Sequence, residues 1–358
     1  MKRLMSFLVA IGALCLLLFA GSRHLQQSQG LTSGNKVLTL YNWGDYIDPK
    51  LITKFQKETG YKVQVETFDS NEAMYTKIQQ GGTNYDLAVP SEYMVQKMRK
   101  AHLLKPIDKS RVHGLTNIDK RFRNLAFDPE NRYSIPYFWG TLGIIYNDQY
   151  VKPGAVQHWD DLWSPAYRNK IMLVDSSRDI MGMALLSQGH SVNTTDIAQL
   201  DAAKAKLDRL SPNVKAIVAD EIKMYMAQNE AALAVTWSGE ASEMMANNSH
   251  LHYVVPSEGS NLWFDNLVIP KTAKHYKAIY AFINFMLKPE NAAQNAAYIG
   301  YATPNDPAKK LLPRSVVNDK AFYPDQTTLA HLQVYQDLGN RMVGIYNDKF
   351  LEFKMFKH

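Results

Sequence analysis

Residues 36–93 read KVLTLYNWGDYIDPKLITKFQKETGYKVQVETFDSNEAMYTKIQQGGTNYDLAVPSEY and carry the pattern that decides the fold. In this stretch, β-prone segments alternate with segments whose apolar residues recur at helical spacing. The strands are expected at 36–43, 61–68 and 85–89. The candidate residues at the helix starts are Asp48 before Pro49, Asp69 with Glu72, and Ser91. Three strands that alternate with three helices predict a parallel sheet with crossover helices.

The rest of the chain repeats this pattern. Strands are expected at 171–174, 231–237, 253–256 and 262–270, and helices at 219–228, from Ser238 onward and at 278–287. The length of 358 residues corresponds to roughly two domains of about 150 residues each. No long Pro/Gly-rich linker separates two halves. Because no such linker is present, the chain is expected to cross between two α/β lobes more than once.

The composition is that of an ordinary globular protein. Hydrophobic residues make up 46% and charged residues 21%, which is enough apolar material for hydrophobic cores. This excludes a disordered tail, a collagen-like chain and a disulfide-stapled miniprotein. The net charge of +6 comes from 40 Lys and Arg against 34 Asp and Glu, without a dense basic run, so nucleic acid is not an expected partner.

The first 22 residues have the layout of a secretory signal. Lys2 and Arg3 precede an apolar run over residues 4–20. A run of about 17 residues is also close to the length that spans a bilayer. Residues 1–22 are therefore predicted to be a signal peptide or an uncleaved anchor, with a buried core helix as the third interpretation. Residues 23–35 are rich in Gln, Ser and Gly and are expected to form a flexible tether. The body of the protein is then expected to be extracytoplasmic.

The single cysteine, Cys15, lies inside this apolar run. Lipidation of Cys15 is one interpretation, although Leu14 before it is larger than the residue that such signals usually have. The exported part of the chain then has no cysteine. It is expected to contain no disulfide, no thiolate nucleophile and no cysteine-based metal site.

Aromatic and acidic residues follow several of the predicted strands. In open α/β sheets, ligands bind beyond the carboxyl ends of the strands. Residues two apart in an extended segment share a face, so Trp263 and Asp265 are expected to point the same way. Apart from Arg178, no Arg or Lys accompanies these residues. The candidate ligand-binding residues are Trp43, Gly44, Asp45, Tyr46, Ser91, Glu92, Tyr93, Asp175, Ser176, Asp179, Trp237, Trp263, Asp265 and Tyr301.

This combination favours an elongated organic cation as the ligand. Each contact between a cation and a ring face contributes about 0.5–2 kcal/mol when partly desolvated. Each ammonium–carboxylate hydrogen bond contributes about 1.5–3 kcal/mol, and a micromolar complex needs roughly 8 kcal/mol. Taken singly, each residue has a structural alternative. Trp and Tyr are commonly core residues, as expected for Trp159 and Trp163. An Asp after a strand is commonly a helix cap, as expected for Asp48 and Asp69, and this interpretation is open for Asp175.

Five stretches of the chain form recognisable motifs: YNWGDYI (41–47), YDLAVPSEY (85–93), YSIPYFWG (133–140), WFD (263–265) and IGYATPN (299–305). These stretches resemble the spermidine/putrescine-binding proteins of bacterial polyamine ABC transporters. The similarity runs in order from residue 36 to the C-terminus, and several motifs agree in both sequence and spacing.

The resemblance implies an α/β, two-lobed periplasmic-binding-protein fold of type II. In this fold each lobe is a mixed, mostly parallel sheet flanked by helices, and the ligand lies in the interlobe cleft, which closes about a hinge. The implied division is residues 36–141 with 266–310 as lobe 1, and residues 142–265 with 311–358 as lobe 2. The residues that match the aromatic and acidic cage of the family are Trp43, Asp45, Tyr46, Ser91, Tyr93, Trp237, Trp263, Asp265 and Tyr301.

The chain departs from the family's pattern at one end of this cage. The family often has a second carboxylate directly after the residue that matches Asp175, where this chain has Ser176. Asp179 matches a family Glu. One anionic contact fewer leaves the preference between spermidine and putrescine open. The family has a ligand-binding Gln near the C-terminus, but the match around Tyr335-Gln336 is ambiguous and no role is assigned there.

The resemblance implies a protein that captures extracellular polyamine and delivers it to the membrane permease subunits of an ABC transporter. Such a protein is not an enzyme, needs no cofactor and is expected to be a monomer. No G-x-S-x-G, Walker or H-E-x-x-H motif points to catalysis. The alternative is a binding protein of the same fold for another small ligand, such as a sugar or a metal ion. His250 and His252 are two apart, but scattered histidines favour a solvated or core role, so no metal site is predicted.

Overall fold

The computed structural model describes residues 36–219 and 221–355. The predicted signal peptide or anchor, the predicted tether and Cys15 lie outside the described residues. Within the two described ranges, no helix has both the length and the apolar character needed to cross a membrane.

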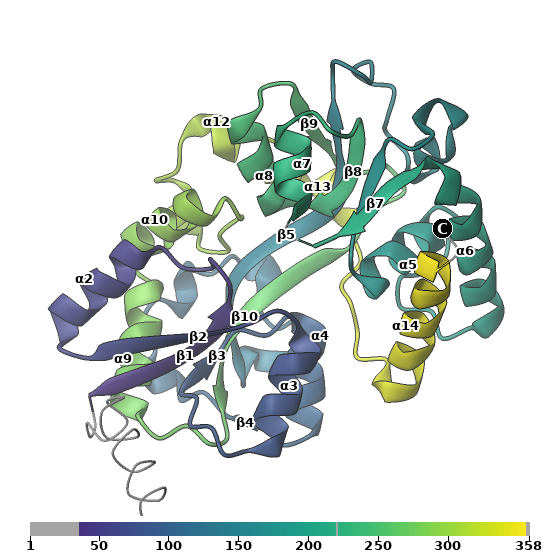
Figure 1. Cartoon of the computed structure of the whole chain (residues 1–358). Helices are drawn as coiled ribbons and strands as arrows, with labels where there is room; N and C mark the ends of the chain where they lie inside the picture. Colours follow the sequence, from purple (N-terminus) through teal and green to yellow (C-terminus); the bar gives the residue numbers. More distant parts are fainter. Residues whose placement is uncertain (1–35, 220, 356–358) are drawn as a thin grey trace, which may run out of the picture.

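Strand β5 (Ser134–Asn147) connects the two halves of the molecule (Figure 1). Its first half pairs antiparallel with β10 (Leu262–Pro270). Its second half pairs antiparallel with β8 (Leu233–Trp237) and with β9 (Leu251–Val254). The strands follow one another in the order β2-β1-β3-β10-β5-β8-β6-β7, so the sheet of one lobe continues into the sheet of the other through β5.

The first lobe has the predicted alternation of strands and helices. β1 (Val37–Trp43) pairs parallel with β2 (Lys62–Phe68) on one side and with β3 (Leu87–Ala88) on the other. β3 is shorter than predicted, whereas β10 completes this sheet as an antiparallel strand. Helices α2 (Pro49–Thr59) and α3 (Asn71–Gln80) connect the strands in opposite directions along the sheet. Right-handed crossovers therefore place them on opposite faces, as Figure 1 shows.

The helix starts of this lobe follow local capping chemistry. Asp48 caps α2 as predicted. The prediction for α3 was wrong by one residue, because the hydroxyl of Ser70, rather than Asp69, accepts the capping hydrogen bond. Ser91 precedes α4 (Glu92–Lys100) but makes no capping hydrogen bond with its side chain. Its hydroxyl instead contacts the site described below.

The second lobe repeats the pattern. β6 (Ile171–Val174) has the predicted bounds and pairs parallel with β7 (Val214–Val218) and with β8. Trp159 is fully buried, as predicted for a core residue, and Trp163 is partly buried. The helices around this sheet are α5 (Ser177–Leu186), α6 (Ile197–Leu210), α7 (Glu221–Ala227), α8 (Ser238–Asn247) and α14 (Gly339–Met355).

Two hydrophobic clusters form the cores of the two lobes. β5 divides between them, because Trp139 belongs to the first cluster and Leu142 to the second. β10 belongs to the first cluster from Leu262 onward, whereas the sequence-based division assigned residues up to 265 to the second lobe. The lobe boundaries remain a proposal, and the membership of the clusters favours a second crossing before Leu262.

The chain crosses between the lobes again near its C-terminal end. Tyr323 belongs to the first cluster and Tyr335 to the second. The segment that follows α13 (Gln326–Ala330) runs beside α4 (Figure 1), where Asp337 and Lys100 form an ion pair of 2.9 Å. The remaining described elements are a short strand, further α-helices and short 3-10 helices. The strand and the α-helices among them are β4 (Leu104–Lys105), α9 (Tyr276–Met286), α10 (Pro289–Ile299), α11 (Asp306–Lys309) and α12 (Arg314–Val317). The short 3-10 helices are Lys109–Arg111, Leu115–Asn117, Lys120–Phe122, Pro129–Asn131, Trp159–Trp163, Pro165–Tyr167 and Ser211–Asn213.

Candidate functional site

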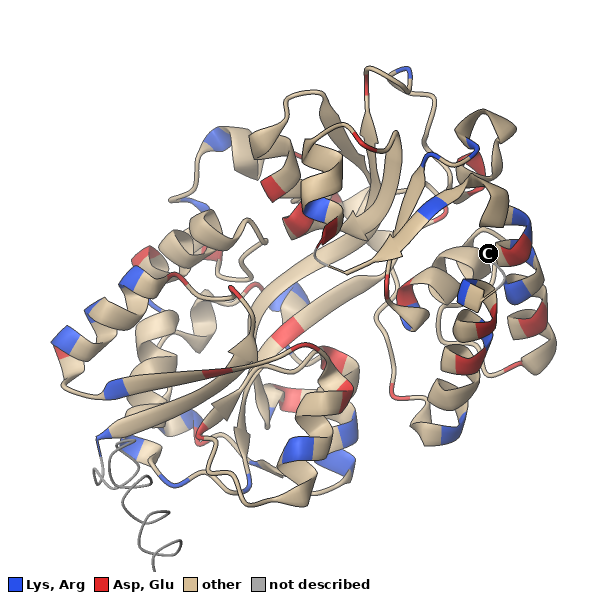
Figure 2. Cartoon of the chain, in the orientation of Figure 1, with Lys and Arg blue, Asp and Glu red and all other residues tan. Residues whose placement is uncertain are grey.

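Asp265 is the centre of the first-lobe part of the site. It is the single acidic residue of β10, and Figure 2 shows the corresponding red segment in the middle of that strand. The register with β5 shifts directly after it, between Asp265 and Asn266. Its Oδ2 accepts a hydrogen bond of 2.5 Å from the Tyr46 hydroxyl, and its Oδ1 accepts one of 2.7 Å from the Ser91 hydroxyl. Burial raises the pKa of Asp265 to about 6, although both hydrogen bonds oppose the rise.

The start of α4 holds the backbone around Asp265. Glu92 Oε2 accepts the backbone N–H of Phe264 at 2.8 Å, and the carbonyl oxygen of Pro90 accepts the N–H of Asn266 at 3.0 Å. Glu92 is fully buried, and its Oε1 has no hydrogen-bond partner within the described ranges. Burial raises the pKa of Glu92 to about 8, and the charge of Asp265 adds to this rise.

Three aromatic rings meet beside Asp265. The ring centroid of Tyr301 lies 5.5 Å from that of Tyr46 and 5.0 Å from that of Trp263, in both cases edge to face. A Cβ atom added to Gly239 would lie 1.6 Å from the Tyr301 ring, so this glycine makes room for the ring. Burial, together with the charge of Asp265, raises the pKa of Tyr46 well above its usual value, so its hydroxyl stays protonated and donates.

Asp179 is the corresponding carboxylate of the second lobe. It lies in the first turn of α5 and accepts hydrogen bonds of 2.6 Å from the Ser176 hydroxyl and 2.8 Å from the Tyr335 hydroxyl. Burial raises the pKa of Asp179, and the side chains of Ser176, Tyr335 and Trp237 oppose that rise. Trp237 is partly buried and packs against both hydrophobic clusters, which places it between the lobes.

A buried cation precedes Asp179 in the chain. The guanidinium carbon of Arg178 lies 4.4 Å from the ring centroid of Tyr335 and 6.0 Å from that of Tyr93. Arg178 also donates a hydrogen bond of 3.0 Å to the side-chain oxygen of Asn193. Because Tyr93 belongs to α4 of the first lobe, this cation–π contact spans the two lobes.

Four other predicted site residues have different surroundings. Gly44 and Asp45 are exposed in the turn after β1, where Asp45 has a positive φ of 48°. Asp175 is exposed and forms an ion pair of 2.8 Å with Lys354. Trp43 is partly buried against the first cluster. The structure thus brings together Tyr46, Ser91, Glu92, Trp263, Asp265 and Tyr301 in the first lobe and Ser176, Asp179 and Trp237 in the second, with Tyr93 packed against both clusters.

Two residues of this region had no assignment from the sequence. Tyr335 is buried and contacts Asp179, whereas its neighbour Gln336 is exposed. The only sequence signal for Tyr335 is the ambiguous match at this position. Arg178 is the one cation near the acidic residues in the sequence, but its burial among tyrosines depends on packing between distant segments.

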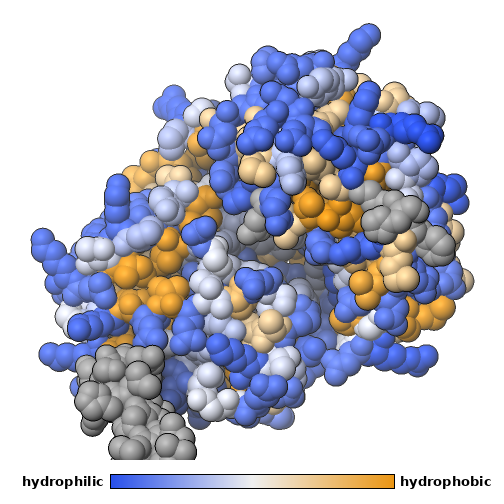
Figure 3. Space-filling view, viewed as in Figure 1, coloured by the Kyte–Doolittle hydropathy of each residue, from blue (hydrophilic) through white to orange (hydrophobic). Residues whose placement is uncertain are grey.

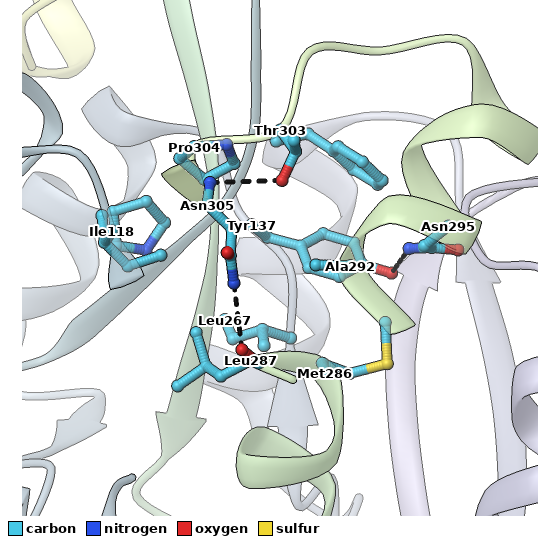
Figure 4. Close-up of a pocket in the computed structure, with 12 residues that line it drawn as sticks. Ile118, Tyr137, Leu267, Met286, Leu287, Ala292, Asn295, Thr303, Pro304 and Asn305 are labelled. Carbon is cyan, nitrogen blue, oxygen red and sulfur yellow. Dashed lines mark hydrogen bonds between the residues drawn. The ribbon is translucent and has the colours of Figure 1, made fainter. Parts of the chain in front are cut away.

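The surface is hollowed near the centre of the face in Figure 3, between the two lobes. A separate cavity of about 20 Å³ lies within the first lobe (Figure 4). It is lined by Tyr137 and Asn295, which share a hydrogen bond of 2.7 Å, and by ten other residues, none of them a predicted site residue. This volume corresponds to about one water molecule, so the cavity is too small for an organic cation.

His250 and His252 both lie against Asp148. Their ring nitrogens are 2.8 and 2.9 Å from the carboxylate oxygens of Asp148. The hydrogen bonds from His252 and His250 lower the pKa of Asp148. Across residues 36–219 and 221–355, no group of three or more His, Cys, Asp or Glu side chains is placed to hold a metal ion.

The site offers the two kinds of group that bind ammonium ions. Carboxylate oxygens accept charge-assisted hydrogen bonds, and ring faces attract cations. Asp265 and Asp179 provide the oxygens on separate lobes, and Trp263, Tyr301 and Trp237 provide the rings. A flexible molecule with a positive charge at each end fits this arrangement better than a compact neutral one.

Known proteins share both the sequence and the fold. Residues 50–324 match the family model described as "Bacterial extracellular solute-binding protein". The chain is 40% identical over 340 residues to the spermidine/putrescine-binding periplasmic protein of Salmonella typhimurium, covering 94% of this chain and 97% of that protein. It is 30% identical over 321 residues to a putrescine-binding periplasmic protein of Escherichia coli, covering 84% and 87% of the two chains.

Two solved structures are similar throughout the described chain. One is the spermidine/putrescine ABC transporter substrate-binding protein of Streptococcus pneumoniae, in complex with calcium and HEPES, with a TM-score of 0.83, 59% identity and coverage of 90% of this chain and 100% of that chain. The other is a putative spermidine/putrescine ABC transporter from Listeria monocytogenes, with a TM-score of 0.85, 57% identity and coverage of 90% and 99%. The predicted two-lobed α/β fold is confirmed, and the chain belongs to the bacterial extracellular solute-binding protein family, together with the spermidine/putrescine-binding proteins.

Proposed function

We propose that the protein captures an extracellular polyamine, spermidine or putrescine, between its lobes and delivers it to an ABC transporter for import. The observation that carries this proposal is the pair of buried carboxylates, Asp265 on the first lobe and Asp179 on the second, each beside aromatic rings. The relatives named above as spermidine/putrescine-binding and putrescine-binding proteins support the same ligand class.

The contacts are sufficient in energy for a micromolar complex. Two ammonium–carboxylate contacts contribute about 1.5–3 kcal/mol each. Stacking of the stem and the ammonium groups on two or three rings adds about 0.5–2 kcal/mol per ring. Their sum exceeds the roughly 8 kcal/mol of a micromolar complex at the upper end of these ranges. Part of the gain is lost in ordering a flexible stem, so a rigidly closed cleft is needed.

The partners follow from this function. The ligand is a small molecule, and the second partner is the membrane permease of an ABC transporter, on the extracytoplasmic side of the membrane. The protein acts as a monomer that binds and releases its ligand unchanged, so we assign it no catalytic residue and no cofactor.

The alternative ligands are a sugar and a metal ion. A sugar site needs many neutral donors and acceptors, whereas the polar groups here are mainly carboxylates and the hydroxyls that donate to them. The two histidines that suggested a metal pair with Asp148 instead.

Calorimetric titration with spermidine, putrescine, calcium, zinc and maltose tests the proposal. We expect heat and a saturable isotherm with the two polyamines and none with maltose. Binding of a metal ion or maltose without binding of either polyamine would overturn the proposed function.

A further inference from the structure

The charges buried around the cleft do not balance. The carboxyl groups of Glu92, Asp265 and Asp179 are buried, whereas Arg178 is the one buried Lys or Arg in the described part of the chain. A buried charge is tolerated only when it is paired and hydrogen-bonded. If all three carboxyls were ionised, two negative charges would lack a partner.

Of the three carboxyl groups, Glu92 accepts the fewest hydrogen bonds that would stabilise its ionised form. Its Oε2 accepts one backbone N–H, from Phe264, and its Oε1 accepts no hydrogen bond from any described residue. Asp265, by contrast, accepts two hydroxyl hydrogen bonds, and Asp179 also accepts two. Of the three carboxyls, Glu92 is therefore the one expected to keep its proton in the protein without ligand.

The groups around Glu92 come from four segments. Asp265 on β10 disfavours its charge and Arg178 on α5 favours it. The hydroxyls of Tyr93 on α4 and Tyr335 before α14 also sense its charge, and both remain protonated because burial raises their pKa well above the usual value. Burial outweighs the single favourable charge of Arg178, and the pKa of Glu92 is raised to about 8.

We propose that Glu92 is a proton-linked member of the polyamine site, ionised by the arriving ammonium group. The O–H bond of the Glu92 carboxyl breaks, its proton passes to water, and the ammonium keeps its own protons and pairs with the two carboxylates of Glu92 and Asp265. This inference rests on the proposed function. It adds that each polyamine molecule that binds releases a proton from the protein near neutral pH.

The same balance bears on which polyamine fits best. The two unpaired negative charges equal the charge of a diamine, so putrescine neutralises the cleft completely. A triamine carries one further positive charge, for which the buried groups provide no carboxylate. Putrescine is therefore the better probe for the proton count.

The test is calorimetry of the full protein with putrescine at pH 7, in two buffers that differ in ionisation enthalpy. The slope of the observed enthalpy against the buffer enthalpy gives the number of protons released. We expect roughly 0.5–1 proton per putrescine for the wild type, as linkage requires for a carboxyl near pKa 8 that becomes ionised on binding. Affinity should rise by up to about tenfold per pH unit between pH 6 and 8.

Glu92→Gln keeps an oxygen for the Phe264 N–H and cannot ionise, so its proton release should fall to near zero and its affinity should drop by about tenfold or more at pH 8. The matched control is Glu58→Gln, because Glu58 is exposed and pairs with Lys288 at 3.3 Å. This control should release as many protons as the wild type.

Wild-type binding of putrescine without proton release overturns the inference and leaves the proposed function standing. The inference also fails if folded Glu92→Gln releases as many protons as the wild type. Absence of any polyamine binding overturns the proposed function itself. The wild-type proton count decides the question even if Glu92→Gln does not fold.

Discussion

The hydroxyl of Tyr46 donates a hydrogen bond of 2.5 Å to Asp265, although 219 positions separate the two residues. Tyr46 follows β1, and Ser91, the second donor to Asp265, follows β3. β1 and β3 are parallel neighbours, and β10 pairs with β3 on its other side. The site therefore forms where the carboxyl ends of adjacent parallel strands meet one antiparallel strand, as expected for an open α/β sheet.

Asp265→Asn is expected to weaken polyamine binding by roughly 10–100-fold, which is the loss of one charge-assisted hydrogen bond. The substitution keeps the shape and one oxygen that can accept a hydroxyl hydrogen bond, and it removes the negative charge. Calorimetric titration of the folded variant measures the effect. Asp201→Asn is the matched control, because Asp201 is exposed and paired with Lys349, and its affinity should change less than about twofold, as for exposed ion pairs. Equal affinities of Asp265→Asn and the wild type would remove Asp265 from the site.

Trp237→Leu and Trp263→Leu should separate ligand contact from core packing. Trp237 is partly buried between the lobes, so its loss should reduce affinity more than melting temperature. Trp263 is 8% exposed and packs on Gly140, where an added Cβ would lie 2.4 Å from the ring. Its replacement should lower both the affinity and the melting temperature, by several degrees for a loss of a few kcal/mol. Thermal melts with and without spermidine measure both. If Trp237→Leu melts far lower but binds normally once folded, Trp237 is a core residue.

The lobes are expected to close on the ligand. Asp265 and Asp179 lie on different lobes, so a cation that contacts both holds the lobes together. Polyamine should reduce the radius of gyration in solution scattering and change tryptophan fluorescence. If neither signal changes at saturating spermidine, ligand binding does not require closure.

Spermidine and putrescine should bind within about tenfold of one another, a gap of about 1.4 kcal/mol. Ser176 donates a hydrogen bond of 2.6 Å to Asp179 and supplies no charge at this end of the cleft. Ser176→Asp adds a carboxylate there, which a third ammonium group would neutralise. Competition titrations should therefore shift toward spermidine in the variant. A thousandfold spermidine preference in the wild type, or an unchanged ratio in Ser176→Asp, would contradict this account of selectivity.

Without ligand, stability should fall as pH rises from about 4.5 to about 8. Burial raises the pKa of Glu92 from 4.5 to about 8 and that of Asp265 from 3.8 to about 6. In this window the unfolded chain has lost protons that the folded protein still holds, so the free energy of unfolding decreases with pH. Glu92 alone gives a slope of up to about 1.4 kcal/mol per pH unit. Urea unfolding at pH 5, 6, 7 and 8 measures the slope, which Glu92→Gln should reduce. Parallel profiles for the variant and the wild type would show that Glu92 does not titrate in this range.

Local patterns made most of the fold predictable. Period-2 and helical spacing depend on neighbouring residues, so the strand at 171–174 was placed correctly, and α3 was misplaced only because Asp69 and Ser70 are both capping residue types. The spacing of Trp263 and Asp265 also predicted their shared strand. The β-bulge after Asp265 could not be predicted, because it depends on pairing with β5, more than a hundred residues earlier.

The burial of Glu92 shows why the site was harder to predict than the fold. An acidic residue in the first turn of a helix is normally exposed, and its negative charge interacts favourably with the positive end of the helix dipole. Here β10 covers Glu92, and Phe264 of that strand, 172 positions later in the chain, donates its backbone N–H to the Glu92 side chain. Likewise, the pairing of Asp175 with Lys354 joins residues 179 positions apart. No local pattern contains such contacts.

The path of the chain through β5 has a consequence for how the protein folds. The first cluster contains both Leu38 and Tyr323, so this core stays incomplete until residue 323 has joined it. Contacts between such distant residues slow folding because a long loop must close before they form. A chain whose first core forms late remains extended for longer after synthesis, and an extended chain is the form that can be threaded through a membrane pore. The lobe exchange that builds the cleft is therefore expected to slow folding, which favours passage of the newly made chain through such a pore.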